Sequence, residues 1–372
     1  MKKILYLLIS MNLGGTEKAF ISEMKRYSEK DEVTVLLLKK EGELLKEIPD
    51  WVTVKEFPFF DYYHHNLVYH PKERLIESLR KGHLIRAIDL VQLHIRMKVT
   101  GDRRIQYKRL FESIPEDKTL YDEVHAFAGP MNFISYYTAF RTSGKRKVQW
   151  IHFDVNEIGF DKEFARNVYK HFNQVSVVSS TGADVLKSKL PALKMNIKSV
   201  QTPIDKEDVR ERSLRQAPQI KKRKTTIITT GRMEQEKGPD LALQTLNKLL
   251  KQGIDAEWYW IGGGKWSEEI ERLREKYNLN DRFHILGVLE NPYSYMIQAD
   301  VYVQPSRHEG FCLTIAEAKI LNLTIVSTHT AGAIDQLKDD QSAWLTGFAP
   351  DELAQGILEA IKIKQAEYSM VE

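Results

Sequence analysis

Two glutamates that lie eight residues apart, Glu309 and Glu317, are the residues of this sequence that most clearly indicate a chemical role. The apolar run over 301–306 predicts a strand that ends shortly before Glu309. Glu317 lies about two turns along the amphipathic segment that follows, predicted as a helix over 313–321. One carboxylate would therefore stand in the loop after a strand, and the other would lie further along the next helix.

The start of that helix is the second chemical feature of this region. Its first main-chain N–H groups, near Gly310, Phe311 and Cys312, would point into the loop, where they and the helix dipole suit a phosphate. Carboxylates that accept sugar hydroxyls beside a phosphate-binding helix start fit a nucleotide sugar as the ligand.

Each glutamate also has a plain structural explanation. Glu317 lies among apolar residues, and a buried carboxylate is costly unless it is hydrogen-bonded. A ribose diol could supply the donors, and so could a salt bridge with Arg232 or Lys319. Glu309 could simply cap the helix that follows it. The occurrence of both acids in one context favours the binding site.

Two cations lie in a loop directly after another predicted strand, over 225–231. Arg232 offers a planar guanidinium and Lys237 a compact ammonium, and together they could neutralise the two phosphates of a nucleoside diphosphate. Either one alone would more simply be a solvated loop charge. Their position at a strand end, between Gly231 and Gly238, favours a role in binding.

Weaker candidates occur elsewhere in the sequence. Gly14 and Gly15 follow the first strand and would let a ligand approach the main chain, although a tight turn explains them equally well. Gly263, in a run of three glycines after a strand, could pack against a base or ribose or could belong to an ordinary turn. His152 ends a predicted strand and could donate a hydrogen bond to a substrate hydroxyl or a reacting oxygen; a structural histidine is the alternative.

Short apolar runs alternate with helical patterns, as in a parallel sheet covered by helices. The pattern fails over 205–224, which is charged, contains a proline and shows no apolar face. We therefore expect an α/β protein of two Rossmann-like domains that face each other across a cleft, residues 1–204 and 225–372, joined by a charged linker. Strands are predicted at 3–9, 33–38, 120–125, 147–153, 174–179, 225–231, 256–264, 283–287, 301–306 and 323–328, and helices at 15–29, 72–112, 239–250, 266–277, 313–321 and 351–366.

Composition narrows the class of protein. The 372 residues are 42% hydrophobic and 28% charged with a net charge of +4, which indicates a soluble globular protein and does not argue for a nucleic-acid partner. Cys312 is the only cysteine, so no intramolecular disulfide can form, which fits a reducing compartment. The N-terminal run MKKILYLLIS resembles a buried strand more than a secretion signal, and no segment approaches the ~20 apolar residues that span a bilayer.

A basic region stands out within the first half. Residues 72–109 contain eleven Lys and Arg against four Asp and Glu. Within this region Leu84, Ile88, Val91 and Ile95 recur at helical spacing, which predicts an amphipathic basic helix. Such a stripe either belongs to the domain core, beneath a solvated basic face, or contacts anionic lipid or a lipid-diphosphate acceptor.

Several common motifs are absent from the sequence. It contains no G-x-G-x-x-G fingerprint of dinucleotide binding, no D-x-D pair for a metal-bridged diphosphate, no Walker A loop, and neither G-x-S-x-G nor H-E-x-x-H. These absences leave a mechanism without metal or cofactor, in which cations and helix starts bind the phosphates.

Taken together, these residues resemble glycosyltransferase family 4, the retaining nucleotide-sugar transferases of GT-B fold. The resemblance extends over most of the chain and is most specific in its C-terminal half. It rests on G-R-x-x-x-x-K-G at 231–238, P-S-x-x-E-G-F at 305–311 and E-A at 317–318, together with Gly14-Gly15, Glu17, His152 and Gly332. Members of this family end with a helix that crosses back to the first domain, whereas this sequence ends soon after its last predicted helix.

The resemblance implies a role for each candidate residue. Arg232 and Lys237 would bind the donor diphosphate. Glu317 would bind the ribose hydroxyls and Glu309 the sugar hydroxyls. The catalytic residues would be His152, Glu309, Arg232 and Lys237, and the remaining donor contacts would be Gly14, Gly15, Gly263, Glu317 and the main chain of Gly310, Phe311, Cys312 and Leu313.

The expected function is that of a retaining, metal-independent hexosyltransferase. It would move a sugar from a nucleoside diphosphate, with UDP slightly favoured, to a glycan, lipid-linked or protein-linked acceptor in surface polysaccharide or glycoconjugate biosynthesis. We expect a cytoplasmic protein that can contact the anionic inner face of the membrane through residues 72–109. The alternatives are a GT-B-like nucleotide-sugar epimerase and a non-catalytic glycan-binding subunit.

Overall fold

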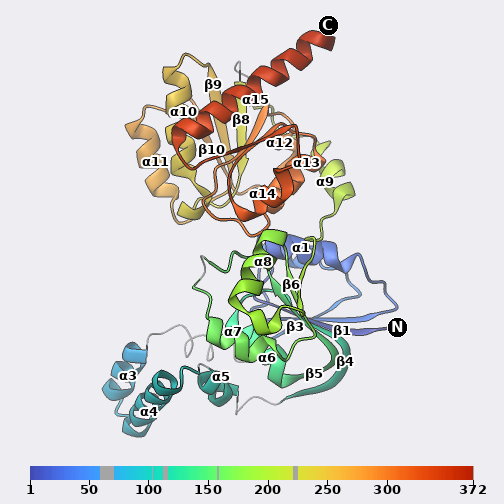
Figure 1. Cartoon of the computed structure of the whole chain (residues 1–372), viewed down its shortest axis with the longest axis vertical. Coiled ribbons are helices and arrows are strands. Elements are labelled where there is room, and N and C mark those ends of the chain that lie inside the picture. Colours follow the sequence, from blue (N-terminus) through green and yellow to red (C-terminus); the bar gives the residue numbers. More distant parts are fainter. Residues whose placement is uncertain (59–70, 103, 112–115, 157–158, 221–224, 372) are drawn as a thin grey trace. The chain divides into compact units, whose positions relative to one another are not determined.

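The chain divides into two compact units, Met1–Pro203 and Ile204–Glu372. The computed structural model describes residues 1–58, 71–102, 104–111, 116–156, 159–220 and 225–371 (Figure 1). Each unit is built on a parallel β-sheet covered by helices, as the alternation of apolar runs and helical patterns predicts.

The first unit contains a parallel sheet with the strand order β3-β2-β1-β4-β5-β6-β7 among its described residues. Strand β1 lies between β2 and β4 and is an almost unbroken apolar run, as expected for a parallel strand that is covered on both faces. The strands are β1 (Lys3–Leu8), β2 (Glu32–Leu37), β3 (Thr53–Glu56), β4 (Asp117–Ala126), β5 (Thr142–Ile151), β6 (Gln174–Val177) and β7 (Ile197–Ser199). The helices are α1 (Gly15–Met24), α3 (Pro71–Arg80), α4 (Leu84–Thr100), α5 (Arg104–Phe111), α6 (Asn132–Arg141), α7 (Lys162–Tyr169) and α8 (Ser180–Lys189), with 3-10 turns η1 (Glu43–Glu47) and η2 (Pro191–Leu193).

The second unit repeats this plan with the strand order β10-β9-β8-β11-β12-β13. Its strands are β8 (Thr225–Thr230), β9 (Ala256–Ile261), β10 (Phe283–Gly287), β11 (Val301–Gln304), β12 (Ile325–Thr328) and β13 (Ala343–Thr346). Its helices are α9 (Lys206–Ser213), α10 (Pro239–Lys251), α11 (Ser267–Lys276), α12 (Tyr293–Met296), α13 (Leu313–Ile320), α14 (Ala331–Leu337) and α15 (Pro350–Val371), with the 3-10 turn η3 (Gln235–Lys237).

The core of the second unit has two layers, one on each face of its sheet. Because successive strand residues point to opposite faces, Ile227 and Trp258 pack with α10, α11 and α15, whereas their neighbours Ile228 and Tyr259 pack with α9, α12, α13 and α14. The sheet is therefore covered by helices on both faces.

The predicted linker over 205–224 is wrong for most of its length. Helix α9 begins at Lys206 and is capped by Asp205, whose side chain accepts a hydrogen bond of 3.2 Å from the main-chain N–H of Asp208. Val209 and Ile220 are buried in the same core cluster as α12 and α13. These two apolar residues are too far apart to produce a visible periodicity, so the sequence pattern missed a segment that belongs to the second unit. Residues 221–224 lie outside the described residues.

The helical region predicted over 72–112 consists of three helices, α3, α4 and α5. Gly82 and Gly101 separate them, with φ angles of 71° and 65° that favour glycine. Gly101 ends α4 in the left-handed conformation, and its N–H donates to the carbonyl of Met97 at 2.9 Å. Residues 103 and 112 of this prediction lie outside the described residues.

In both sheets the strand order reverses at one point, between β1 and β4 in the first unit and between β8 and β11 in the second. Open α/β sheets bind ligands at such a switch point, beyond the carboxyl ends of the strands. In the second unit, the loops 231–238 and 305–312 follow β8 and β11. In the first unit, Gly14 and Gly15 lie beyond β1, and His152 directly follows β5.

Candidate functional site

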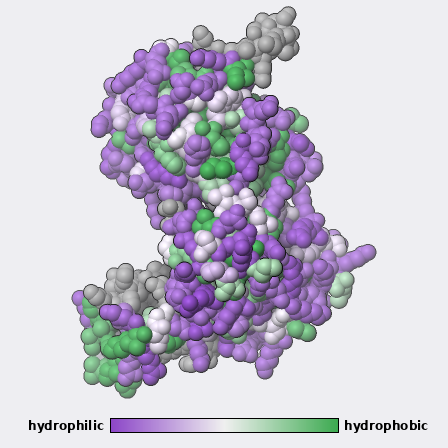
Figure 2. Space-filling view, in the orientation of Figure 1, coloured by the Kyte–Doolittle hydropathy of each residue, from purple (hydrophilic) through white to green (hydrophobic). Residues whose placement is uncertain are grey.

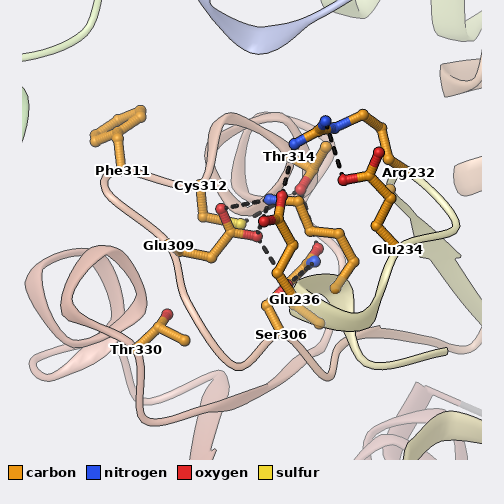
Figure 3. A network of polar contacts seen from close by, with 12 residues as sticks. Arg232, Glu234, Glu236, Ser306, Glu309, Phe311, Cys312, Thr314 and Thr330 are labelled. Atoms are coloured by element: carbon orange, nitrogen blue, oxygen red, sulfur yellow. Dashed lines mark hydrogen bonds and ion pairs between the residues drawn. The ribbon is translucent and has the colours of Figure 1, made fainter. Parts of the chain in front are cut away.

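A buried ion pair joins the two loops of the second unit. The ammonium of Lys237, in the loop after β8, donates to both carboxylate oxygens of Glu309, in the loop after β11, at 2.9 Å each (Figure 3). Only 18% of the lysine side chain and 9% of the glutamate side chain are exposed. Burial opposes the charged ammonium, but the Glu309 carboxylate outweighs it, so the pKa of Lys237 lies above the ordinary lysine value.

A chain of hydrogen-bonded neutral side chains from β11, the loop after it and α13 supports this ion pair. Ser306 donates to Glu309 Oε1 at 2.8 Å, and the Gln304 amide donates to Ser306 Oγ at 2.8 Å. Tyr302 and Thr314 donate to the Gln304 carbonyl at 2.5 and 3.0 Å, which ties β11 to the first turn of α13. The Glu309 carboxylate is thus fixed by an ion and by a satisfied polar network.

Arg232 lies in the same loop but is held differently. Its guanidinium pairs with Glu234 at 3.1 Å and with Glu236 at 2.6 Å, and 53% of its side chain is exposed (Figure 3). Exposed ion pairs of this kind contribute about 0–1 kcal/mol. An incoming anion could therefore take over the guanidinium at little cost.

The two cations thus differ in their freedom to move. Separating Lys237 from Glu309 would leave a buried charge without its counterion, which costs about 3–5 kcal/mol. An ammonium has three N–H donors, and Glu309 takes two of them, so one is left for a ligand while the pair stays intact. Lys237 is a fixed anchor and Arg232 a cation that can be recruited.

Two further contacts hold the loops in register. The Arg307 guanidinium makes a bidentate pair with Asp240 at 2.8 and 2.7 Å, and it also donates to the Gln235 carbonyl at 2.7 Å. Gly238 has a φ of 70°, and a Cβ there would collide with the carbonyl oxygen of Pro305. A glycine is therefore required where the two loops cross.

Helix α13, which the sequence predicts over 313–321, begins beside the ion pair. Cys312 precedes it with a φ of 63°, and its buried thiol lies 3.4 Å from Thr314 Oγ1. Burial and the Glu309 charge raise the pKa of this thiol well above its usual range, so the thiol is protonated. The Gln336 amide donates to the main-chain carbonyls of Phe311 and Cys312, the two residues before the helix. The Phe311 ring points away from the ion pairs (Figure 3).

The structural explanations considered for the two glutamates are wrong in detail. Glu309 does not cap α13, because Cys312 occupies that position without a side-chain cap. Arg232 pairs with Glu234 and Glu236, and Lys319 pairs with Asp340 at 2.9 Å, rather than with Glu317.

Glu317 is almost fully buried, and its Oε1 accepts the Tyr293 hydroxyl at 2.7 Å. Burial and the nearby Glu317 charge raise the pKa of Tyr293 well above its usual range. The hydroxyl therefore stays protonated and serves as a neutral donor to the carboxylate. The predicted ribose contact of Glu317 stays a prediction.

The glycine run after β9 packs against the loop that carries Arg232. Met233 donates its main-chain N–H to the Gly263 carbonyl at 2.8 Å, and a Cβ on Gly264 would collide with Met233. A close approach of two loops thus accounts for part of the run, and the predicted donor contact of Gly263 stays a prediction.

In the first unit, His152 lies at the carboxyl edge of the sheet among aromatic rings. It stacks on Trp150, with centroids 5.7 Å apart, and contacts Phe127 at 4.9 Å. Burial lowers the pKa of His152 to about 4, although a hydrogen bond to the Phe127 main chain raises it in part. The ring is therefore neutral at pH 7. Nε2 is buried and has no hydrogen-bond partner among the described residues.

The tautomer of His152 follows from these contacts. With Nε2 unpartnered, Nδ1 carries the proton given to Phe127, and Nε2 of the neutral ring is an acceptor. The expectation that His152 donates to a substrate is therefore revised: it would accept a hydrogen bond from a hydroxyl.

Gly14 and Gly15 lie at the same edge of the first sheet. Gly14 precedes α1 in an extended conformation, and α1 begins at the exposed Gly15. A Cβ on Gly14 would collide with the carboxylate of Glu17. The main chain therefore turns here close to an acidic side chain.

The second unit thus brings together Arg232, Lys237, Glu309 and the start of α13, and their roles in donor binding stay predictions. Gly14, Gly15 and His152 belong to the first unit. Sequence reasoning missed the supporting residues Glu234, Glu236, Gln304, Ser306, Tyr293 and Thr314. Their signal was only proximity, since Glu234 and Glu236 follow Arg232 by two and four residues and Ser306 lies three before Glu309.

Comparison with known proteins follows the same division. Residues 210–372 match the family model described as "Glycosyl transferases group 1". The chain is 28% identical over 195 residues to one subunit of the phosphatidylinositol N-acetylglucosaminyltransferase of Arabidopsis thaliana, covering 51% of this chain and 42% of the relative. It is 28% identical over 142 residues to "2-deoxystreptamine N-acetyl-D-glucosaminyltransferase" of Niallia circulans, covering 38% of this chain and 36% of the relative. The matched segments span less than half of each relative.

A similarity of fold extends over nearly the whole chain. The crystal structure of Anabaena HepE in complex with UDP and glucose matches 98% of this chain and 91% of its own, with a TM-score of 0.66 and 16% identity. The fold is therefore GT-B, with two parallel-sheet α/β domains.

Proposed function

We propose that the protein is a glycosyltransferase that takes its sugar from a nucleoside-diphosphate sugar. The observation that carries this proposal is the placement of Lys237, Arg232 and Glu309 around the start of α13, at the switch point of the second sheet. This site lies inside the segment that matches the group 1 glycosyltransferase model.

The geometry suggests which residues would bind each part of the donor. The remaining N–H of Lys237 and the recruitable guanidinium of Arg232 would bind the diphosphate, together with the main chain from Gly310 to Leu313. Glu309, held by Lys237 and Ser306, would accept sugar hydroxyls. Glu317 would accept the ribose hydroxyls, with Tyr293 as its neutral partner in their absence.

The reaction we propose is transfer with retention and without a metal ion. The acceptor hydroxyl would attack the anomeric carbon on the face from which the diphosphate departs, and the departing phosphate oxygen would take the proton. The largest catalytic contribution would then be stabilisation of the leaving charge by Lys237 and Arg232. Transfer should persist in EDTA, and the anomeric configuration of the product, read by NMR, should equal that of the donor.

The sugar and the acceptor are proposed from the relatives. The names of both relatives above include N-acetylglucosaminyltransferase, so UDP-N-acetylglucosamine is the first donor to test. The acceptor would be a glycan, or a lipid-linked or protein-linked acceptor, in surface polysaccharide or glycoconjugate biosynthesis. We place the reaction in the cytoplasm, next to the inner face of the membrane.

A thermal-shift screen with UDP, GDP, ADP and their sugars tests the donor site. One nucleoside diphosphate should raise the melting temperature of the wild type, because it binds the folded state, and should raise that of Arg232→Ala much less. Arg272→Ala is the matched control, since Arg272 is an exposed arginine paired with glutamates elsewhere in the same unit. A wild type that responds to no nucleotide would refute the assignment.

Two other functions predict different results. With purified donor alone, an epimerase converts the sugar, whereas a transferase gives at most slow hydrolysis. A non-catalytic glycan-binding subunit would leave cellular glycan unchanged when Glu309→Ala or Lys237→Ala replaces the wild type. The fixed Lys237–Glu309 pair beside the helix start favours a working donor site over a non-catalytic subunit, and the test with donor alone separates the transferase from the epimerase.

A further inference from the structure

Helix α4 of the first unit carries two apolar faces. Ala87 and Leu93 are buried and form the inner one. The outer one is between 40% and 80% exposed and consists of Leu84, Ile88, Val91, Ile95 and Val99. Figure 2 shows hydrophobic atoms gathered over the α3–α4 pair. The stripe that the sequence predicts is therefore a surface, which we call the outer stripe, and not part of the core.

The outer stripe is continuous along the helix. Its members are spaced by three or four residues, so each stands next to the last on one face. At ~100° per residue, Leu93 lies on the opposite side of the helix from this face, and Ala87 lies at the edge of the face beside Val91. Helix α3 adds Ile76 and Leu79, each half exposed and three residues apart.

The helical region that carries this surface is packed on the body of the first unit through α5. Tyr107 of α5 stacks on Tyr136 of α6, with centroids 5.5 Å apart, and meets the edge of Phe164 at 5.3 Å. The outer stripe is thus presented by an anchored element, and an exposed apolar surface of this extent marks a contact site.

Charge indicates what this surface contacts. Arg96 directly follows Ile95 and Lys98 directly precedes Val99, so a cation lies on either side of the outer stripe. Asp89 is the only acid in the sequence of α4. Long basic side chains beside an apolar stripe place their stems in the apolar layer and their charges at the lipid headgroups.

We propose that the outer stripe, with Ile76 and Leu79, is a docking surface for an anionic phospholipid membrane. The α4 helix would lie flat in the headgroup region, because the described part of the chain contains no helix long and apolar enough to cross a bilayer. A second copy of this chain fits less well, since a symmetric contact would bring the basic flanks of the two copies together. This surface belongs to the first unit and the proposed donor site to the second, and the proposal does not depend on that site.

Vesicle sedimentation with the full chain tests the surface. The wild type should bind vesicles of phosphatidylcholine mixed with phosphatidylglycerol much better than phosphatidylcholine alone, and less at high salt. The double variant Ile88→Ser/Ile95→Ser should partition about tenfold less or more weakly still. Replacement of Arg96 and Lys98 by glutamine should weaken binding about fivefold per charge.

Matched controls separate the docking surface from general effects. Leu120→Ser and Lys194→Gln change an exposed apolar and an exposed basic residue elsewhere in the first unit and should bind as the wild type does. Ile88→Trp gives a positive signal, because its fluorescence should shift to the blue only with anionic vesicles.

The thermal shift with nucleotide should be unchanged in every variant, which shows that the fold and the donor site are intact. Equal binding by Ile88→Ser/Ile95→Ser and the wild type would overturn the proposal. The proposal would also be overturned if the wild type did not bind vesicles but formed a dimer that Ile88→Ser/Ile95→Ser dissociates.

Discussion

The two units carry the same strand order around their switch points, yet the side chains at those points differ in kind. The second unit gathers Arg232, Lys237 and Glu309 with two further glutamates, in pairs that satisfy one another. The first unit offers glycine main chain and His152, a neutral ring packed against Trp150 and Phe127.

This difference shows how one architecture can serve two kinds of ligand. Ionised groups that neutralise each other can be kept in place without a ligand, and an anion can then exchange with the weaker of the pairs. A buried neutral acceptor such as His152 suits an uncharged hydroxyl. A hydrogen bond between two neutral groups needs no counterion in the buried site. We therefore expect the second unit to respond to changes of charge and the first to changes of pH.

The largest expected effect is that of Lys237→Met. It keeps the apolar stem but leaves the buried Glu309 carboxylate without its counterion, so the free energy of unfolding of the second unit should fall by about 3 kcal/mol or more. Urea unfolding measures this loss. The double variant Lys237→Met/Glu309→Gln should recover most of the stability but not the nucleotide binding. A single variant as stable as the wild type would show that the pair is not a buried anchor.

The second prediction concerns acid. The pKa of His152 is about 4 in the folded protein and about 6.5 in the unfolded chain. Between these values the unfolded state binds more protons, so stability falls as the pH drops from about 6.5 to 4, by up to about 3 kcal/mol. Urea midpoints across this range should fall less steeply for His152→Gln. Parallel curves for the two proteins would contradict the buried neutral ring.

The third prediction tests how neutral donors hold charge in the second unit. Tyr293→Phe removes a hydroxyl that donates to the buried Glu317, and hydrogen bonds to charged groups contribute about 1.5–3 kcal/mol. The free energy of unfolding should fall by about 2 kcal/mol. Tyr295→Phe, in the same helix, is the control and should change it little. Equal effects of the two changes would mean that the bond to Glu317 is unimportant.

The smallest expected effect is a gain. Glu236→Gln weakens the exposed pair with Arg232, so nucleoside diphosphate should compete less for the guanidinium and bind up to about fivefold more tightly. Isothermal titration calorimetry measures the change, with Glu268→Gln as the exposed control in the same unit. Weaker binding would show that Glu236 itself contacts the donor.

Much of the second unit could be predicted because its signals are local. The strand predicted at 225–231 and the helix predicted at 313–321 are confirmed as β8 and α13, and they place Lys237 and Glu309 beyond the ends of β8 and β11. Strand type follows from apolar runs, and parallel strands bring their carboxyl ends to one edge. The positions of Lys237 and Glu309 within the fold could therefore be predicted from the sequence before any contact was known.

Pairing between side chains was not readable in the same way. Nothing in the sequence separates a Lys237 that faces solvent from one that is fixed by Glu309, seventy-two residues away. The burial of Val209 and Ile220 depends on helices that come later in the chain. The amphipathic stripe of α4 was visible, but its exposure depends on which of two apolar faces the neighbouring helices cover.

Cys312 offers a way to time the opening of the donor loop. It is the only cysteine, its thiol is buried and protonated, and it stands at the joint between the Glu309 loop and α13. A thiol reagent can modify it only during excursions that expose it, so the labelling rate reports the frequency of a single local event. Ligands that close the loop should lower the labelling rate of Cys312. The chain already contains this cysteine as its reporter, so no substitution is needed.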